Sequence, residues 1–214
     1  DSFVIVNVGD SRAYLLRGKI HLHRARASKA PRDEALKAAN DLSEYAEHRP
    51  EDMDGLLSLG QAQALGDRTD KALRTFAQAA RLDPKDPRPK LGGGRAYMAV
   101  RDWRRARQSL DEAEALAQGK SGEIYTERAV CLVAEGDKRG ALADYDRGIP
   151  RHEERLTDMA RSRAHPADIA QIQALAGRAF YGRGRIRVVM RLPERVRAER
   201  PADLAVGRRR VVAQ

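Results

Sequence analysis

The chain has 214 residues, of which 42% are apolar, 34% charged and 5% aromatic, so it is long enough for one domain or a short repeat array with a real core. The shortage of aromatic residues disfavours a β-sandwich or barrel and indicates cores of alanine and leucine. The net charge is +10, from 41 basic and 31 acidic residues, and the single cysteine excludes an intramolecular disulfide framework or a multi-cysteine metal cluster.

The first twenty residues fit two different structures. Residues 3–8 form a β-rich run before a Gly9-Asp10 turn signal, which predicts a β-hairpin over residues 3–20. This string resembles a segment of the PPM-type metal-dependent protein phosphatases, but the Asp-Gly motifs that would hold two metal ions are missing, so no activated water is implied. Residues from Ser11 onward also fit a helix. We expect that helix, preceded by a lead-in over residues 1–10.

A period of 34 residues runs through the middle of the chain. It relates Gly60 to Gly94, Ala72 to Ala106, Phe76 to Leu110 and Ala79 to Ala113. The same template extends in both directions, with Ala38, Leu42 and Pro50 one period earlier and Ala141, Tyr145 and Gly148 35 residues later. A fixed period of this length predicts a repeat architecture.

Each unit has the pattern of two helices. In residues 53–86, a Gly66-Asp67 break separates a first helix from a second one with apolar residues at helical spacing, and Asp83-Pro84 ends the second. Gly60 and Ala72 are small, which predicts that the two helices approach each other closely at these residues.

The unit MDGLLSLGQAQALGDRTDKALRTFAQAARLDP resembles the tetratricopeptide repeat, in which Leu-Gly, Ala, an aromatic residue and Pro occupy fixed slots. The resemblance implies an all-α solenoid of helical hairpins wound as a right-handed superhelix. We expect an array over residues 11–155 with about four units: 11–52, 53–86, 87–120 and 122–155. About eight extra residues in the first unit, HRARASKA or nearby, are expected to lengthen its first helix or its turn.

The C-terminal part departs from the repeat. Residues 156–184 are expected to form a linker or extra helix and a degenerate capping repeat, in which Gly177, Phe180 and Gly184 keep the spacing of a first helix. Its second helix fails, because Pro193 stands in the slot of the packed aromatic residue and an interior proline costs ~3 kcal/mol. Residues 185–214 are an arginine-rich tail that we expect to be poorly ordered or weakly helical.

No side chains have the spacing of a catalytic or metal site. His21 and His23 lie two residues apart and therefore point to different faces of a helix, and Cys131 is expected to be a small buried thiol. The three glycines at 92–94 lack the Lys-Ser/Thr pair of a phosphate loop. We therefore predict that the protein is not an enzyme and uses no cofactor or metal ion.

The resemblance implies that the first helix of each hairpin lines a concave groove that binds a partner. The groove positions that it implies are Arg12, Leu15, Lys19, Asp54, Leu57, Gln61, Arg88, Leu91, Arg95, Glu123, Thr126 and Val130. Some family members clamp carboxylates with fixed Lys, Asn and Arg residues, but here Gln61 and Val130 stand where asparagines are wanted. Lys19, Arg88 and Arg95 would still favour an acidic segment, unless they form only a solvated face.

We predict a noncatalytic scaffold that binds a protein or peptide, with an acidic segment as one candidate. One alternative is that the arginine-rich tail binds nucleic acid or another anionic surface, with a steep salt dependence. Another is an interaction module of a larger enzyme, a phosphatase if residues 3–20 are a remnant of one. No stretch approaches the ~20 apolar residues of a membrane helix. The chain begins at Asp1 without a methionine, so we expect a fragment or processed product, located in the cytoplasm, with a periplasmic location left open.

Overall fold

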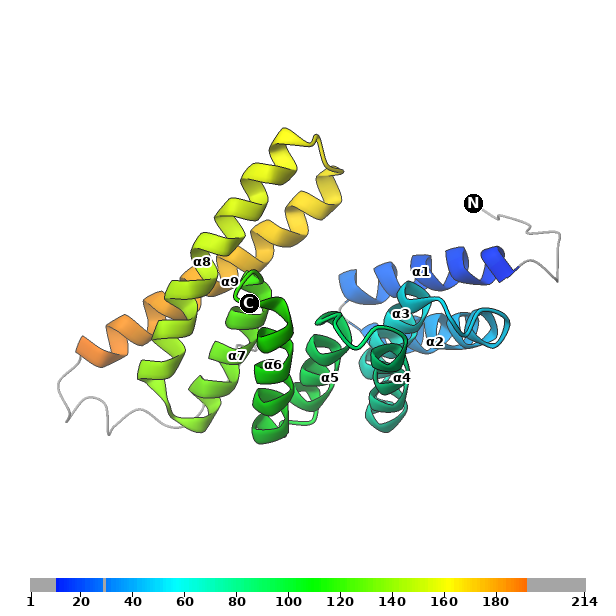
Figure 1. Ribbon diagram of the computed structural model, residues 1–214, viewed down its shortest axis with the longest axis horizontal. Coiled ribbons are helices and arrows are strands. Elements are labelled where there is room, and N and C mark those ends of the chain that lie inside the picture. The colour runs from blue at the N-terminus through cyan, green and yellow to red at the C-terminus, as the bar shows by residue number, and fades with distance from the viewer. Residues whose placement is uncertain (1–10, 29, 192–214) are drawn as a thin grey trace, which may run out of the picture.

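The computed structural model describes residues 11–28 and 30–191, and these residues form helices joined by short turns (Figure 1). The helices of this described part are α1 (Ser11–Ala27), α2 (Pro31–His48), α3 (Met53–Leu65), α4 (Thr69–Leu82), α5 (Arg88–Ala99), α6 (Trp103–Ala117), α7 (Gly122–Glu135), α8 (Lys138–Arg161) and α9 (Pro166–Arg191). The described residues contain no strand, which confirms the prediction of an all-α fold.

Consecutive helices pack as hairpins, and the hairpins stack into a curved array with α1 at one end and the α8–α9 pair at the other (Figure 1). The odd-numbered helices contact one another in series, α1 with α3, α3 with α5, α5 with α7 and α7 with α9. Each even-numbered helix packs mainly against the odd-numbered helices before and after it. The odd-numbered helices therefore lie on the inner, shorter side of the curve.

Glycines allow the two helices of a hairpin to approach. A Cβ added to Gly60 would lie 2.6 Å from the ring of Phe76, and one added to Gly94 would lie 2.8 Å from Cγ of Leu110. Gly18 has the same relation to Leu42, at 2.6 Å. This confirms the predicted close approach, because any larger residue at these points would hold the hairpin open.

The core is a row of separate clusters along the array. The middle cluster contains Leu56, Leu57, Phe76 and several buried or partly buried alanines, and equivalent clusters surround Leu42, Leu110 and Tyr145. Alanine and leucine dominate, as the composition predicted. Each cluster joins neighbouring hairpins, which is the nearest-neighbour packing of a solenoid.

The turns inside the hairpins repeat as well. Asp67 and Arg101, which are 34 residues apart, both have φ of 60°, and Gly136 at the next turn has φ of 89°. Asp102 and Asp137 then accept hydrogen bonds from backbone N–H groups in the first turns of α6 and α8, at 3.1 and 2.8 Å. These caps satisfy donors that have no partner within the helix.

The extra residues of the first hairpin are shared between both of its helices. α1 and α2 have 17 and 18 residues, whereas α3 and α4 have 13 and 14. The predicted helix from Ser11 onward is confirmed, and the β-hairpin alternative is wrong for residues 11–20. Residues 1–10, including the rest of that alternative, lie outside the described residues.

Two predicted boundaries near the C-terminus do not coincide with helix ends. α8 continues past residue 155 to Arg161: Glu153 stands in the slot that holds Pro50 and Pro84 in the first two units, and no turn such as Gln118-Gly119, which ends the third, occurs there. α9 continues past residue 184 to Arg191, where we expected weak order, because no proline or polar turn interrupts it. Pro193 and the rest of the tail from residue 192 lie outside the described residues.

Candidate protein-binding groove

Side chains from all five inner helices meet along the concave side of the array. They are Arg26 of α1, Gln61 of α3, Arg95 of α5, Glu123 and Glu127 of α7, and Arg178 of α9. Segments separated by up to about 150 residues thus contribute to one polar surface, which we call the inner network.

Arg95 is the centre of the inner network. Its guanidinium donates to Oε1 of Glu127 at 3.1 Å and also to Glu123, while Arg178 donates to the two Glu127 oxygens at 3.3 and 3.4 Å. Glu127 is only 3% exposed, so its charge is compensated almost wholly by these two arginines. Burial lowers the pKa of Arg95, but the two nearby carboxylates outweigh burial and raise it overall.

Arg26 is the cation of the network that lacks a carboxylate partner. It donates to the amide oxygen of Gln61, and no ion pair joins it to an acidic residue within the described residues. Its side chain is exposed, yet the surrounding protein desolvates it and, with the like charge of Arg95, lowers its pKa despite opposition from Glu123.

The elongation of the first hairpin is what places Arg26 there. The residue lies in the last turn of α1, inside the inserted stretch HRARASKA, and it reaches α3. The insertion therefore supplies a groove residue, although we predicted only that it lengthens a helix or turn.

Three residues predicted for the groove are buried. Leu57 and Leu91 are 7% and 8% exposed and belong to core clusters, because α3 and α5 turn these positions toward their neighbouring helices. Thr126 has no exposed surface, and its hydroxyl donates to the carbonyl of Gly122 and lies 2.9 Å from Nε2 of His152. These three residues support the fold and do not offer surface to a partner.

The other predicted positions divide between the inner network and its edges. Asp54 accepts from Arg88 at 2.7 Å, so these two exposed groups neutralise each other at the first turns of α3 and α5. Arg12 and Lys19 are exposed on α1, Leu15 packs against the first core cluster, and Val130 is partly buried. Gln61, Arg95 and Glu123 belong to the inner network.

Arg26, Glu127 and Arg178 are groove residues that sequence reasoning missed. The repeat register assigns only one set of positions per hairpin, and Arg26 falls in the insertion while Arg178 falls in the degenerate unit. No sequence signal singled out Glu127, which is one of three glutamates in α7.

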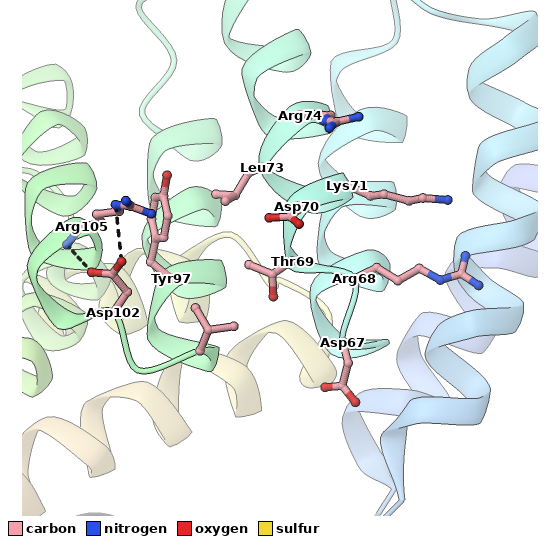
Figure 2. A pocket seen from close by; sticks show the side chains of 11 residues that line it. Asp67, Arg68, Thr69, Asp70, Lys71, Leu73, Arg74, Tyr97, Asp102 and Arg105 are labelled. Atoms are coloured by element: carbon pink, nitrogen blue, oxygen red, sulfur yellow. Dashed lines mark hydrogen bonds and ion pairs between the residues drawn. The ribbon is translucent and has the colours of Figure 1, made fainter.

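A second concavity lies where the turns α3–α4 and α5–α6 meet (Figure 2). It has a volume of about 730 Å³ and is lined by charged residues on both sides. Figure 2 shows Arg68, Lys71 and Arg74 pointing away from Tyr97. Its lining contains no histidine, cysteine or glutamate.

Cys131 is buried, as predicted, and burial raises its pKa to about 12, so its thiol is protonated and unreactive at neutral pH. The described residues contain no cluster of three or more potential metal ligands. None of the helices in the described part is long and apolar enough to cross a membrane.

Residues 32–87 and 91–155, more than half of the chain, match the family model of the tetratricopeptide repeat. The chain belongs to the tetratricopeptide repeat family. Repeat proteins of this family are generally non-enzymatic adaptors, in agreement with our prediction that this one is not an enzyme. The matched residues do not include residues 3–20, which carry the phosphatase resemblance.

Solved structures share the fold. A thermophilic TPR protein of Thermus thermophilus has a TM-score of 0.58 and 20% identity, over 78% of this chain and 84% of that one. A T3SS complex from Aeromonas hydrophila has a TM-score of 0.54 and 19% identity, over 69% and 91%. MamA from Desulfovibrio magneticus RS-1 has a TM-score of 0.52 and 16% identity, over 82% and 98%. At these sequence identities the similarity shows the fold alone. The search of curated proteins found no match to the chain.

Proposed function

We propose that this tetratricopeptide repeat array is a noncatalytic scaffold that binds an acidic segment of a partner protein in its concave groove. The family supports the general role, because stacked hairpins leave an extended curved surface that suits recognition of proteins. The observation that carries the finer proposal is the pair of like charges, Arg26 and Arg95, at the centre of that surface.

The charges of the inner network are not balanced. Glu123 and Glu127 both bind Arg95, and Glu127 also binds Arg178, so the carboxylates hold Arg95 in place and leave Arg26 with a neutral partner. A carboxylate from a ligand beside Arg26 would relieve its repulsion with Arg95 and form a charge-assisted hydrogen bond in a partly desolvated site. A basic ligand would increase the repulsion.

The proposal is tested by selecting random short peptides on the immobilised chain and measuring their affinities by fluorescence anisotropy. The selected peptides should be rich in aspartate and glutamate. Arg26→Glu should weaken them about 10- to 100-fold, since a hydrogen bond to a charged group contributes roughly 1.5–3 kcal/mol.

Arg81→Glu is the matched control, because it makes the same charge change at an exposed residue in the last turn of α4, on an outer helix. It should change affinity less than about twofold if the effect of Arg26 is local. Selection of neutral or basic peptides, or equal losses in the two variants, would contradict the proposal.

A further inference from the structure

Arg95 of α5 presents the two edges of its planar guanidinium to different groups. Nε and Nη2 form one edge, and both donate to Oε1 of Glu127, at 3.3 and 3.1 Å. Nη1 and Nη2 form the other edge. There Nη2 donates to Glu123, whereas Nη1 has no hydrogen-bond partner among the described residues. A carboxylate pairs best with an arginine when it accepts from both nitrogens of one edge, so the edge that contains Nη1 is only half occupied.

The two glutamates that bind Arg95 differ in burial. The side chain of Glu127 is 3% exposed, and it also accepts from Arg178 of α9. The side chain of Glu123 is 17% exposed, and Arg95 is its only ion-pair partner in the described part of the chain. Glu127 therefore fixes the guanidinium from the interior, whereas Glu123 binds it on the side that is more open to solvent.

Glu123 also acts on Arg26, the arginine of the inner network without a carboxylate partner. Its negative charge opposes the lowering of the pKa of Arg26 by burial and by Arg95. No ion pair joins Glu123 to Arg26 within the described residues. One internal carboxylate thus acts on two arginines and binds only one of them. A ligand carboxylate in the proposed function would occupy the same electrostatic position.

A purely structural role explains less about Glu123. Without it, Arg95 would keep both hydrogen bonds to Glu127, so its guanidinium would stay in place. Glu123 lies in the first turn of α7, where the helix dipole favours a carboxylate, but that effect does not require an arginine partner. The bond between Glu123 and Arg95 is therefore the part of the network that can be exchanged at the smallest cost.

We propose that Glu123 is a built-in competitor of the ligand and determines which acidic segments bind. An aspartate or glutamate of the partner displaces Glu123, accepts from Nη1 and Nη2 of Arg95 together, and faces Arg26. The exchange replaces one carboxylate by another at Nη2 and adds interactions at Nη1 and at Arg26, so a carboxylate that uses this whole set is favoured over one that does not. This inference rests on the proposed function, because it requires an acidic ligand in the groove.

The probe is a hexaglutamate peptide with acetylated and amidated ends, so that its carboxylates come only from side chains. Its binding to the full chain is measured by isothermal titration calorimetry. The Glu123→Gln variant should bind it about fivefold more tightly or better, because Nη2 is released and a like charge is removed. Unchanged or weaker binding would overturn the proposal, since loss of a residue that only positions Arg95 would not strengthen binding.

Glu112→Gln is the matched control. It removes the same charge from a glutamate of α6 that is paired with a basic residue, Lys90 of α5. If the effect of Glu123 is local, this control should change the affinity less than about twofold. Equal gains in the two variants would mean that net charge sets the affinity, and this would overturn the proposal.

Thermal unfolding without peptide tests the division of roles between the two glutamates. Glu123→Gln should lower Tm by less than about 4 °C, because Arg95 stays bound to Glu127 and only a favourable charge in the first turn of α7 is lost. Glu127→Gln should lower Tm more, because Arg95 and Arg178 both lose a buried carboxylate partner. Equal losses would make Glu123 a structural tie and would overturn the proposal.

Arg26→Glu separates this inference from the proposed function. If hexaglutamate does not bind, or binds equally well to the Arg26→Glu variant, the groove is not a site for acidic segments and both proposals fail. If Arg26→Glu weakens binding but Glu123→Gln does not strengthen it, the groove proposal stands and only the role given to Glu123 is wrong.

Discussion

Helices α3 and α5 inside the array and helix α9 at its end all carry glycines, but these glycines have different surroundings. Gly60 and Gly94 are pressed against Phe76 and Leu110, whereas no heavy atom of the described residues lies within 4 Å of a Cβ added to Gly184. The comparison teaches that a glycine on a helix permits close packing but does not produce it. A neighbouring helix has to supply the side chain that enters, and among the described helices α9 packs against α8 and α7.

The arginines of the two regions differ in exposure rather than in the kind of partner that holds them. Within the array, Arg128 joins Asp111 of α6 and Asp144 of α8 at 2.7–2.9 Å, and Asp144 is 3% exposed. On α9, Arg183 and Arg185 lie over the exposed rings of Phe180 and Tyr181 at 5.1 and 5.6 Å. Arg178, Arg183 and Arg187 of α9 are also held by carboxylates of neighbouring helices, Glu127 and Asp146, but their side chains are 25–53% exposed, against 13% for Arg128.

The largest expected effect is on the free energy of unfolding, which should depend much more on a buried ring of the array than on an exposed ring of α9. Phe76→Ala should lower the free energy of unfolding by about 3–5 kcal/mol, because it empties the slot at Gly60 and opens a cavity in the core. Tyr181→Ala should change it by less than about 0.5 kcal/mol, because its ring is exposed. Urea unfolding followed by circular dichroism measures both. Comparable losses would mean that α9 is covered by something else.

Adding one methyl group to each glycine should give changes of opposite sign. Gly60→Ala should destabilise the chain by about 1–3 kcal/mol, because the new Cβ collides with a buried ring that cannot move aside. Gly184→Ala should stabilise it by up to about 1 kcal/mol through helix propensity. Equal destabilisation of the two variants in urea would mean that Gly184 is packed against a neighbour as Gly60 is.

A smaller, pH-dependent effect on stability is expected in the hairpin of α7 and α8. His152 of α8 is buried, and burial lowers its pKa from the ordinary 6.5, with Arg155 adding to the shift and Glu123 opposing it. Below pH 6.5, His152 therefore takes up a proton more readily in the unfolded chain than in the folded chain. The free energy of unfolding is thus retained above pH 6.5 and falls as the pH drops toward the pKa of His152 in the folded chain.

Thermal unfolding between about pH 7.5 and pH 5 measures this effect of His152 protonation. His152→Leu should flatten the dependence of Tm on pH, and Thr126 keeps its hydrogen bond to Gly122 in this variant. His48→Ala, at an exposed histidine of α2, serves as the control and should retain the dependence. An unchanged profile in the His152 variant would assign the pH dependence to other groups.

The repeat was predictable because its signals are local and periodic. The same or a similar residue recurs 34 residues away from Gly60, Ala72, Phe76 and Pro84. A hairpin also depends mainly on contacts within that distance along the chain. The end of α8 was mispredicted because the pattern contained no signal for continuation. The absence of a closing proline at Glu153 was no such signal, because α6 has Gln118 in the same slot and still ends at Ala117.

The groove was predicted less well because its chemistry joins different hairpins. Arg95 and Glu123 were placed on the concave side from the repeat register, but their bond to each other was not predicted, and Glu127 and Arg178 were missed. Thr126 was assigned to the surface by its slot, and it is buried because α8 brings His152 against it.

By itself the sequence determined that the chain is a row of helical hairpins with alanine- and leucine-rich cores, since apolar periodicity, small residues and prolines act within one unit. Only the tertiary structure decided which charges meet in the groove and which glycines receive a neighbour. Those outcomes depend on how successive hairpins rotate against one another and on where the stack ends. Arg26 of α1 meets Gln61 of α3, and Gly94 of α5 receives Leu110 of α6, because the helices that carry these partners pack beside them in the array.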